Sequence, residues 1–169
     1  WYKVPSKIYF KRGALSQALA ELSDKHRAYI ITDKTMEQLG HVRAVADVLE
    51  SLNIKFRVFS NVLPDPNISN VQEALNIANS WQPDMIIALG GGSAIDEGKM
   101  VWLMYENPDT SFEDIAMRFM DIRKRIYAAP PLGKKAVMVA IPTTSGTGSE
   151  VTPFTIITDE KTGTKYAIT

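Results

Sequence analysis

Three consecutive glycines, Gly90, Gly91 and Gly92, separate an apolar run from a stretch with helical character, and they constrain the fold more than any other feature. The residues before them, 85–89, are nearly free of polar groups and predict a short buried strand. Glycine takes positive φ and has no Cβ, so the backbone here can turn sharply and approach a ligand closely. We therefore predict a strand, a tight turn and a helix start in direct succession.

The helix after the glycines is expected to begin at Ser93. Ser93 and Asp96 have the spacing of a capping box, in which side chains bind the first free N–H groups of a helix. Helix starts also attract anions, because their N–H groups and the positive end of the helix dipole point outward. The segment predicts a phosphate-binding turn, and a plain strand-to-helix connection stays open as the alternative.

Strands and amphipathic helices alternate along most of the chain. This alternation predicts an α/β domain, a parallel sheet flanked by helices, with two further strands at the end that form a hairpin or extend the sheet. Apolar runs predict strands over 7–10, 29–32, 55–59, 85–89, 136–141, 154–158 and 165–169, and helical spacing predicts helices over 14–24, 42–52, 71–81 and 93–105.

Composition excludes several classes of partner. The 169 residues suit one domain, and the formal net charge of zero argues against a nucleic-acid-binding protein. Apolar runs are too short to span a membrane, and the absence of cysteine fits a cytoplasmic protein. The sequence begins at Trp1 rather than at a methionine, which suggests a piece of a longer protein.

Asp33 follows the predicted strand 29–32, where open α/β sheets bind their ligands. A carboxylate there accepts hydrogen bonds from the hydroxyls of an adenosine ribose and repels a 2′-phosphate, which favours NAD over NADP. Aspartate is also a common helix N-cap, and the sequence does not separate the two roles. Because the acid precedes the glycines instead of following them, the chain lacks the ordinary dinucleotide-binding fingerprint.

A segment rich in hydroxyls and glycine, 142–150, follows the predicted strand 136–141. Such a segment offers N–H and O–H donors to phosphate or ribose oxygens, although a bland solvated turn is the alternative. If strands 85–89 and 136–141 are neighbours, both loops face one crevice.

Groups that would transform a ligand are not recognisable. His26 and His41, the only histidines, have no partner at metal-ligand spacing and are expected to be solvated. No serine or threonine is paired with a histidine base by its spacing. Lys99 and Lys165 are each long enough to reach a phosphate or ribose, but a lone lysine is more often solvated.

Residues 109–135 interrupt the alternation. An apolar stripe at helical spacing predicts a helix that ends at Pro130. Packing on its own domain is the simpler expectation, and packing against another domain or subunit is the alternative. The stripe consists of Phe112, Ile115, Phe119, Ile122 and Ile126.

Four blocks together resemble the iron-containing (group III) alcohol dehydrogenases. They are 31–35, 64–67, 90–96 and 142–152, and their order and spacing match that family over essentially the whole chain. Residues 112–127 and the opening 1–5 look like the alcohol dehydrogenase half of the bifunctional aldehyde–alcohol dehydrogenases.

The resemblance implies a Rossmann-like NAD-binding domain of the dehydroquinate-synthase-like type over residues 1–169, and reduction of acetaldehyde or a similar short aldehyde with NADH. It places Asp33 at the adenosine ribose and Lys165 at the nicotinamide ribose. The remaining implied NAD contacts are Gly91, Gly92 and Ser93 at the pyrophosphate, Thr143, Thr144 and Thr147 on the nicotinamide side, and, less firmly, Asp65 and Asp96.

The same resemblance implies iron held by an aspartate and three histidines in a helical domain downstream of Thr169, so this chain alone is expected to be inactive. It also implies homo-oligomers, and filaments among the bifunctional enzymes, which keeps an assembly role open as the alternative function. A related enzyme of the glycerol or dehydroquinate type is a further alternative.

Overall fold

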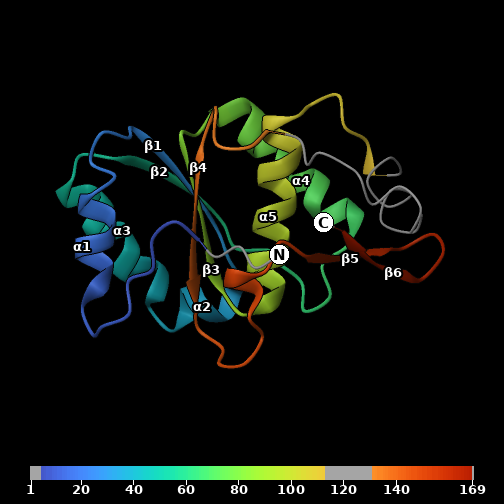
Figure 1. Ribbon diagram of the computed structural model, residues 1–169, viewed down its shortest axis with the longest axis horizontal. Helices are drawn as coiled ribbons and strands as arrows, with labels where there is room; N and C mark the ends of the chain where they lie inside the picture. Colours follow the sequence, from blue (N-terminus) through green and yellow to red (C-terminus); the bar gives the residue numbers. More distant parts are fainter. Residues whose placement is uncertain (1–4, 113–130, 169) are drawn as a thin grey trace.

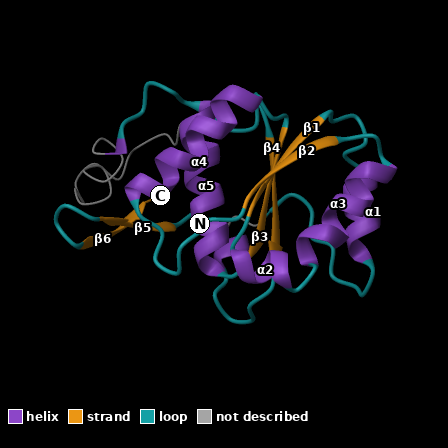
Figure 2. Cartoon of the chain, turned by 180° about the vertical axis from the view of Figure 1, so that it is seen from behind, coloured by secondary structure: helices purple, strands orange, loops and turns teal. Residues whose placement is uncertain are grey.

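A computed structural model describes residues 5–112 and 131–168 of the chain. A central sheet has helices on both of its faces, and a separate hairpin lies beside two of the helices (Figures 1 and 2). The elements are α1 (Ala14–Ala20), β1 (Arg27–Ile31), α2 (Lys34–Gln38), α3 (His41–Ser51), β2 (Lys55–Phe59), α4 (Ile68–Trp81), β3 (Met85–Gly90), α5 (Gly92–Glu106), β4 (Val137–Pro142), a 3₁₀ turn (Ser149–Val151), β5 (Thr155–Asp159) and β6 (Thr164–Ile168).

The central sheet has the strand order β2-β1-β3-β4, and every neighbouring pair is parallel. All residues of β3 are buried, as the apolar run 85–89 predicts for a strand covered on both faces. β3 and β4 are neighbours, so the ends of these two strands do lie side by side. The predicted fold class, a parallel sheet flanked by helices, is confirmed.

Alternate residues of β1 supply two separate cores. Ala28 and Ile30 pack with the apolar residues of α1 and α3 on one face of the sheet. Tyr29 and Ile31 pack with α4 and α5 on the other face. This division follows from the period of two in a strand, which sends successive side chains to opposite faces.

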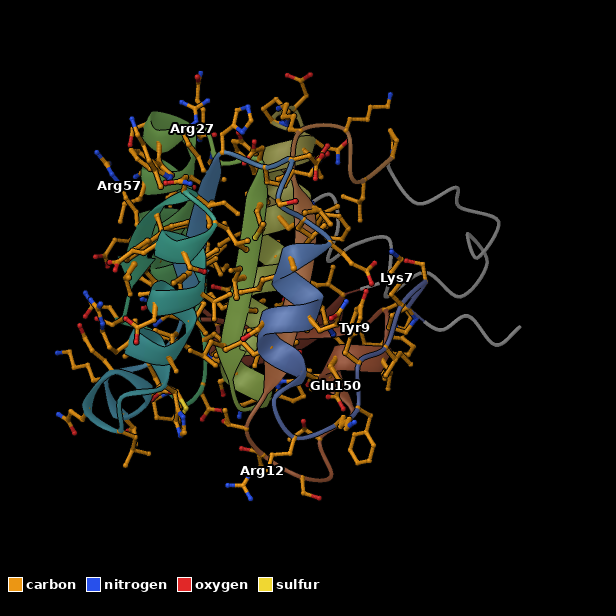
Figure 3. The ribbon with its side chains drawn as sticks, turned by 90° about the vertical axis from the view of Figure 1, so that its left-hand side faces the viewer. Lys7, Tyr9, Arg12, Arg27, Arg57 and Glu150 are labelled. Atoms are coloured by element: carbon orange, nitrogen blue, oxygen red, sulfur yellow. The ribbon has the colours of Figure 1, made fainter. Side chains whose placement is uncertain are left out.

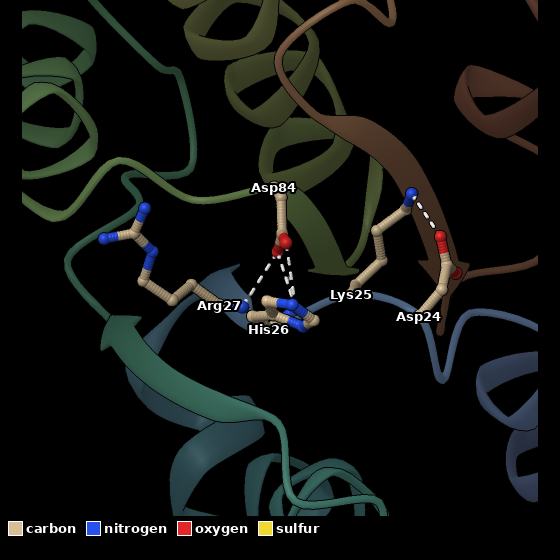
Figure 4. A network of polar contacts seen from close by, with 5 residues as sticks. All are labelled: Asp24, Lys25, His26, Arg27 and Asp84. Carbon is tan, nitrogen blue, oxygen red and sulfur yellow. Dashed lines mark hydrogen bonds and ion pairs between the residues drawn. The ribbon is translucent and has the colours of Figure 1, made fainter.

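Asp84 joins β1 and β3 at the amino-terminal edge of the sheet. Its carboxylate accepts hydrogen bonds from the backbone N–H of His26 at 2.9 Å and of Arg27 at 2.8 Å (Figure 4). At the opposite edge, the hydroxyl of Thr32 donates to the carbonyl of Leu89 at 2.7 Å. These bonds fix the two strands at both ends, so the loops that leave the carboxyl edge start from defined positions.

The hairpin of β5 and β6 forms a second, antiparallel sheet and does not extend the first. Ile157 and Ile168 are its fully buried residues and belong to the same core as α4 and α5. The ring of Phe112 packs edge-on against Tyr166, with centroids 5.7 Å apart. The rest of the predicted stripe lies outside the described residues.

Several expectations about the elements and their boundaries are wrong, among them three near the chain start and the glycine turn. Residues 7–10 are not a strand: all four are exposed, and their backbone is irregular. α1 ends at Ala20 rather than at residue 24, because Leu22 N–H already bonds the carbonyl of Leu19 in a tighter turn. The helix after the glycines begins at Gly92, one residue before Ser93.

None of the helices in the described ranges has both the length and the hydropathy needed to cross a bilayer.

Candidate nucleotide-binding site

The strand order brings together two loops that are far apart in the sequence. After β1 the chain moves outward to β2 and then returns to place β3 on the other side of β1. The carboxyl ends of β1 and β3 therefore form a topological switch point, where open α/β sheets bind ligands. Asp33 follows β1 and the glycine turn follows β3, which explains how the acid can precede the glycines in sequence and still meet them in space.

Asp33 is the N-cap of α2. Its Oδ1 accepts hydrogen bonds from the backbone N–H of Thr35 at 2.8 Å and of Met36 at 3.1 Å, so the capping role is confirmed. Its Oδ2 lies next to Gly90, where an added Cβ would be 3.3 Å away. This second oxygen has no hydrogen-bond partner within the described chain, so capping leaves one carboxylate oxygen for another ligand. Contact with a ribose stays a prediction.

The glycine turn is too crowded for side chains. A Cβ at Gly90 would lie 2.9 Å from the Cβ of Ala94, and Gly90 also has a φ of 145°, which other residues rarely adopt. A Cβ at Gly91 would lie 3.0 Å from the hydroxyl oxygen of Thr144. A Cβ at Gly92 would lie 3.2 Å from that of Ser149. Because Gly91 and Gly92 have no side chains, their backbone can lie close to the loop that follows β4. A plain strand-to-helix turn would not need such a close approach.

No side chain caps α5, so the predicted capping box is wrong. Its N-cap is Gly91, whose backbone is extended, with φ −78° and ψ −170°. Ser93 lies in the first turn, and its hydroxyl donates to the carbonyl of Pro64 in another loop. Asp96 lies further along the helix and accepts a hydrogen bond from Ile156 N–H at 3.1 Å. The first N–H groups of α5 are therefore not satisfied by a capping side chain, and an anion can bind them.

The hydroxyl-rich loop after β4 lies along this turn. The N–H of Thr143 donates to the carbonyl of Gly90 at 2.9 Å. Thr144 lies against Gly91, and Thr147 and Ser149 lie against Gly92. Thr143, Thr144 and Thr147 are exposed, so their hydroxyls are available to a ligand.

Asp65 and Lys165 form an exposed ion pair at 2.7 Å, beside the loop that contacts Ser93. This pair connects β6 to the segment before α4. The N–H of Thr158 donates to the carbonyl of Pro66 at 2.9 Å and supports the same connection. All ten predicted cofactor contacts thus belong to the carboxyl edge or to the segments attached to it, although Asp96 is buried and faces β5.

Two residues next to the site have contacts that the sequence does not predict. Ser149 lies against Gly92, and the hydroxyl-rich segment already contained this signal. Lys99 is not solvated: its side chain is 16% exposed, and its ammonium donates to the carbonyl of Phe154 at 2.6 Å. No spacing in the sequence relates residue 99 to residue 154.

Metal-binding groups are not found in the described ranges, where no cluster of three or more His, Cys, Asp or Glu side chains is arranged to hold an ion. His26 and His41 are both exposed, as expected. The described residues therefore do not form an iron site by themselves.

Two surface hollows lie away from the carboxyl edge. One, of about 670 Å³, is lined by residues including Phe56 and Trp81. The other, of about 350 Å³, is lined by residues including Arg27, Asp84 and Lys135, at the amino-terminal edge of the sheet. Figure 3 shows Arg27 and Glu150, the latter in the loop after β4, at opposite ends of the sheet. We favour the carboxyl edge, because it is where, within residues 5–112 and 131–168, an acidic residue, a crowded glycine turn and a hydroxyl-rich loop meet.

Comparison with known proteins identifies the family of this chain. The family model for iron-containing alcohol dehydrogenases matches residues 5–169. The bifunctional aldehyde-alcohol dehydrogenase AdhE of Escherichia coli K12 is 51% identical over 170 residues, which are 99% of this chain and 19% of that protein. The chain therefore spans about a fifth of the length of this relative.

Solved structures give the same result. An iron-containing alcohol dehydrogenase from Thermococcus thioreducens has a TM-score of 0.88 at 28% identity, with 99% of this chain and 43% of that chain covered. A sulfoacetaldehyde reductase from Bifidobacterium kashiwanohense, solved in complex with NAD+, has a TM-score of 0.80 at 28% identity, with 99% and 42% covered. Because the family model matches nearly every residue and these folds agree, the chain belongs to the iron-containing alcohol dehydrogenase family.

Proposed function

We propose that this chain is the NAD-binding portion of an enzyme that reduces acetaldehyde, or a similar short aldehyde, to the alcohol with NADH. The observation that carries the proposal is the meeting of Asp33, the glycine turn and the hydroxyl-rich loop at one switch point. The aldehyde is proposed because the 51% identical relative is named an aldehyde-alcohol dehydrogenase.

In this proposal, different residues bind different parts of the dinucleotide. Asp33 Oδ2 accepts hydrogen bonds from the adenosine ribose while Oδ1 keeps its bonds to α2. The backbone N–H groups of Gly91, Gly92 and Ser93 bind the pyrophosphate at the start of α5. The hydroxyls of Thr143, Thr144 and Thr147 lie on the nicotinamide side.

Lys165 and Asp65 close the other side of the site in this proposal. The ammonium of Lys165 binds the nicotinamide ribose once its pairing with Asp65 loosens or is shared. The pair is exposed, so separating the two charges costs little free energy. NADH, when bound, supplies the hydride, and this chain supplies its binding and orientation.

The iron of the family is proposed to be held by residues of a longer protein, outside this chain. Accordingly the chain alone is expected to bind NADH and to lack dehydrogenase activity. Assembly into oligomers or filaments through the stripe of residues 112–126 stays a separate prediction.

Calorimetric titration of the folded chain with NADH tests the proposal. Saturable binding in the micromolar-to-millimolar range supports it, and NADPH is expected to bind more weakly because Asp33 repels its 2′-phosphate. A folded chain that binds neither nucleotide at millimolar concentration contradicts it. Activity of the longer protein with acetaldehyde and NADH, lost on removal of iron, tests the catalytic part separately.

A further inference from the structure

Lys99 is a mostly buried lysine whose ammonium hydrogen-bonds the segment after the hydroxyl-rich loop. It lies on the second turn of α5, behind the glycine turn, and its side chain is 16% exposed. Its ammonium donates to the carbonyl of Phe154 at 2.6 Å and to the hydroxyl of Thr152 at 3.5 Å. Both acceptors lie just beyond the hydroxyl-rich loop.

Asp96, one turn earlier, binds the next residues of the same segment. Its Oδ2 accepts from Ile156 N–H at 3.1 Å, and its backbone carbonyl accepts from the hydroxyl of Thr155 at 2.7 Å. Its Oδ1 is buried and has no hydrogen-bond partner in the described part of the chain. The nearest compensating charge is the ammonium of Lys99, 3.6 Å away, so Lys99 also stabilises the buried carboxylate.

These contacts make one of two anchors for the hydroxyl-rich loop. At the other end, the N–H of Thr143 is bonded to the carbonyl of Gly90. Between the anchors, Thr144 and Ser149 lie within van der Waals reach of Gly91 and Gly92. Both anchors belong to the same strand–turn–helix unit, β3 and α5, so they fix the loop relative to the glycine turn itself.

We propose that Lys99 is a positioning residue that fastens the hydroxyl-rich loop to α5, and so holds the nicotinamide side of the site at a set distance from the pyrophosphate turn. This inference rests on the proposed function for its ligand, but the fastening itself does not depend on any ligand. Burial lowers the pKa of Lys99, while the charges of Asp96 and Glu150 act in the opposite direction.

If Lys99 positions the hydroxyl-rich loop, the Lys99→Met variant is expected to lose affinity for NADH but not for AMP. NADH spans both halves of the site, whereas AMP reaches only the side of Asp33 and the glycine turn. The variant is expected to bind NADH about tenfold more weakly and AMP within twofold of the unsubstituted chain. Amide hydrogen exchange at residues 144–152 is expected to speed up, while exchange in β1 and β3 stays unchanged.

Two further variants keep the test interpretable. Lys161→Met makes the same change of charge at an exposed lysine in the β5–β6 turn and is expected to alter neither affinity. Thr155→Val removes the bond to the Asp96 carbonyl with little change of shape, and is expected to weaken NADH binding about threefold with AMP unaffected. Thr155→Val carries the test if Lys99→Met does not fold.

The outcomes separate this inference from the proposed function. Equal loss of NADH and AMP affinity, or unchanged exchange in residues 144–152, overturns the positioning role of Lys99. If the unsubstituted chain binds neither nucleotide, the proposed function fails, and the exchange measurement still decides whether Lys99 fastens the loop.

Discussion

Thr144 lies so close to Gly91 that a Cβ on the glycine would be 3.0 Å from the threonine hydroxyl oxygen. The backbone of Gly91, with φ −78° and ψ −170°, is nevertheless open to any residue. The glycine is therefore required by the approach of the loop after β4 rather than by backbone conformation. A side chain at residue 91 would therefore disturb the neighbouring loop without straining the backbone. A substitution of Gly91 thus tests the binding site directly.

Gly91→Ala is expected to fold and to bind NADH about tenfold more weakly, equivalent to about 1.4 kcal/mol. The added methyl group pushes Thr144 away and fills space beside the N–H groups at the start of α5. Calorimetry measures the affinity, and circular dichroism checks the fold. Unchanged affinity in a folded variant would mean that the turn does not touch the ligand.

Gly98→Ala is the matched stability variant on the same helix. Its Cβ would lie 2.6 Å from the Cβ of Ala88 in β3, so α5 must shift away from the sheet. Overpacking of this kind costs about 1–3 kcal/mol of the free energy of unfolding. Denaturant unfolding should show this loss, while NADH affinity of the folded protein stays within about twofold of the unsubstituted chain. A large loss of affinity without a loss of stability would contradict this division of roles.

Asp33→Asn separates the two roles of the carboxylate. Asparagine caps helices as well as aspartate does, so the free energy of unfolding is expected to change by less than about 0.5 kcal/mol. Loss of the charge should weaken NADH binding several-fold and reduce the preference for NADH over NADPH. Asp33→Ala should lose both the cap and the affinity. If Asp33→Asn keeps full NADH affinity and preference, Asp33 acts only as a cap.

The buried carboxyl group of Glu97 predicts that the free energy of unfolding depends on pH. The side chain is fully buried in α5, and neither carboxyl oxygen has a hydrogen-bond partner among the described residues. Burial, and to a lesser extent the charge of Glu73, raises its pKa from 4.5 to about 8. The folded state thus holds this proton more tightly than the unfolded state does.

The contribution of Glu97 to the free energy of unfolding is therefore greatest below pH 4.5 and falls as the pH rises toward about 8. Above that pH it does not change further. The loss is about 5 kcal/mol at most, from 1.36 kcal/mol for each pKa unit. Glu97→Gln, which cannot ionise, should flatten this part of the profile in denaturant unfolding between pH 5 and pH 9. The exposed Glu37→Gln serves as control, because Glu37 is not among the groups that shift the pKa of Glu97. Parallel profiles for the chain and Glu97→Gln would rule out a buried proton at this residue.

The sheet was predictable because its strands are continuous apolar runs. β3 is buried at every residue, and only a strand covered on both faces suits such a run. α2 was missed because residues 34–38 have no apolar period: the helix contains no fully buried residue and starts at the Asp33 cap. The run 7–10 suggested a strand, but a strand also needs a hydrogen-bonding neighbour, and an apolar pattern does not reveal one.

The site residues were predictable individually, but their arrangement was not. Asp33 and Gly90 meet because β1 and β3 are neighbours, and strand order is not encoded in periodicity. The hydroxyl of Ser93 bonds Pro64, far away in the sequence, instead of capping its own helix, so a local motif gave the wrong partner. Lys99 likewise binds Phe154 through tertiary structure alone.

Titration of the isotopically labelled chain with NADH, followed by backbone amide NMR shifts, tests the central claim most directly. The account predicts that the largest saturable shifts occur at Gly91, Gly92 and Ser93 and in the loop of residues 143–149. Shifts concentrated instead around Phe56 and Trp81, at the larger surface hollow, or no shifts at millimolar NADH in a folded chain, would contradict it.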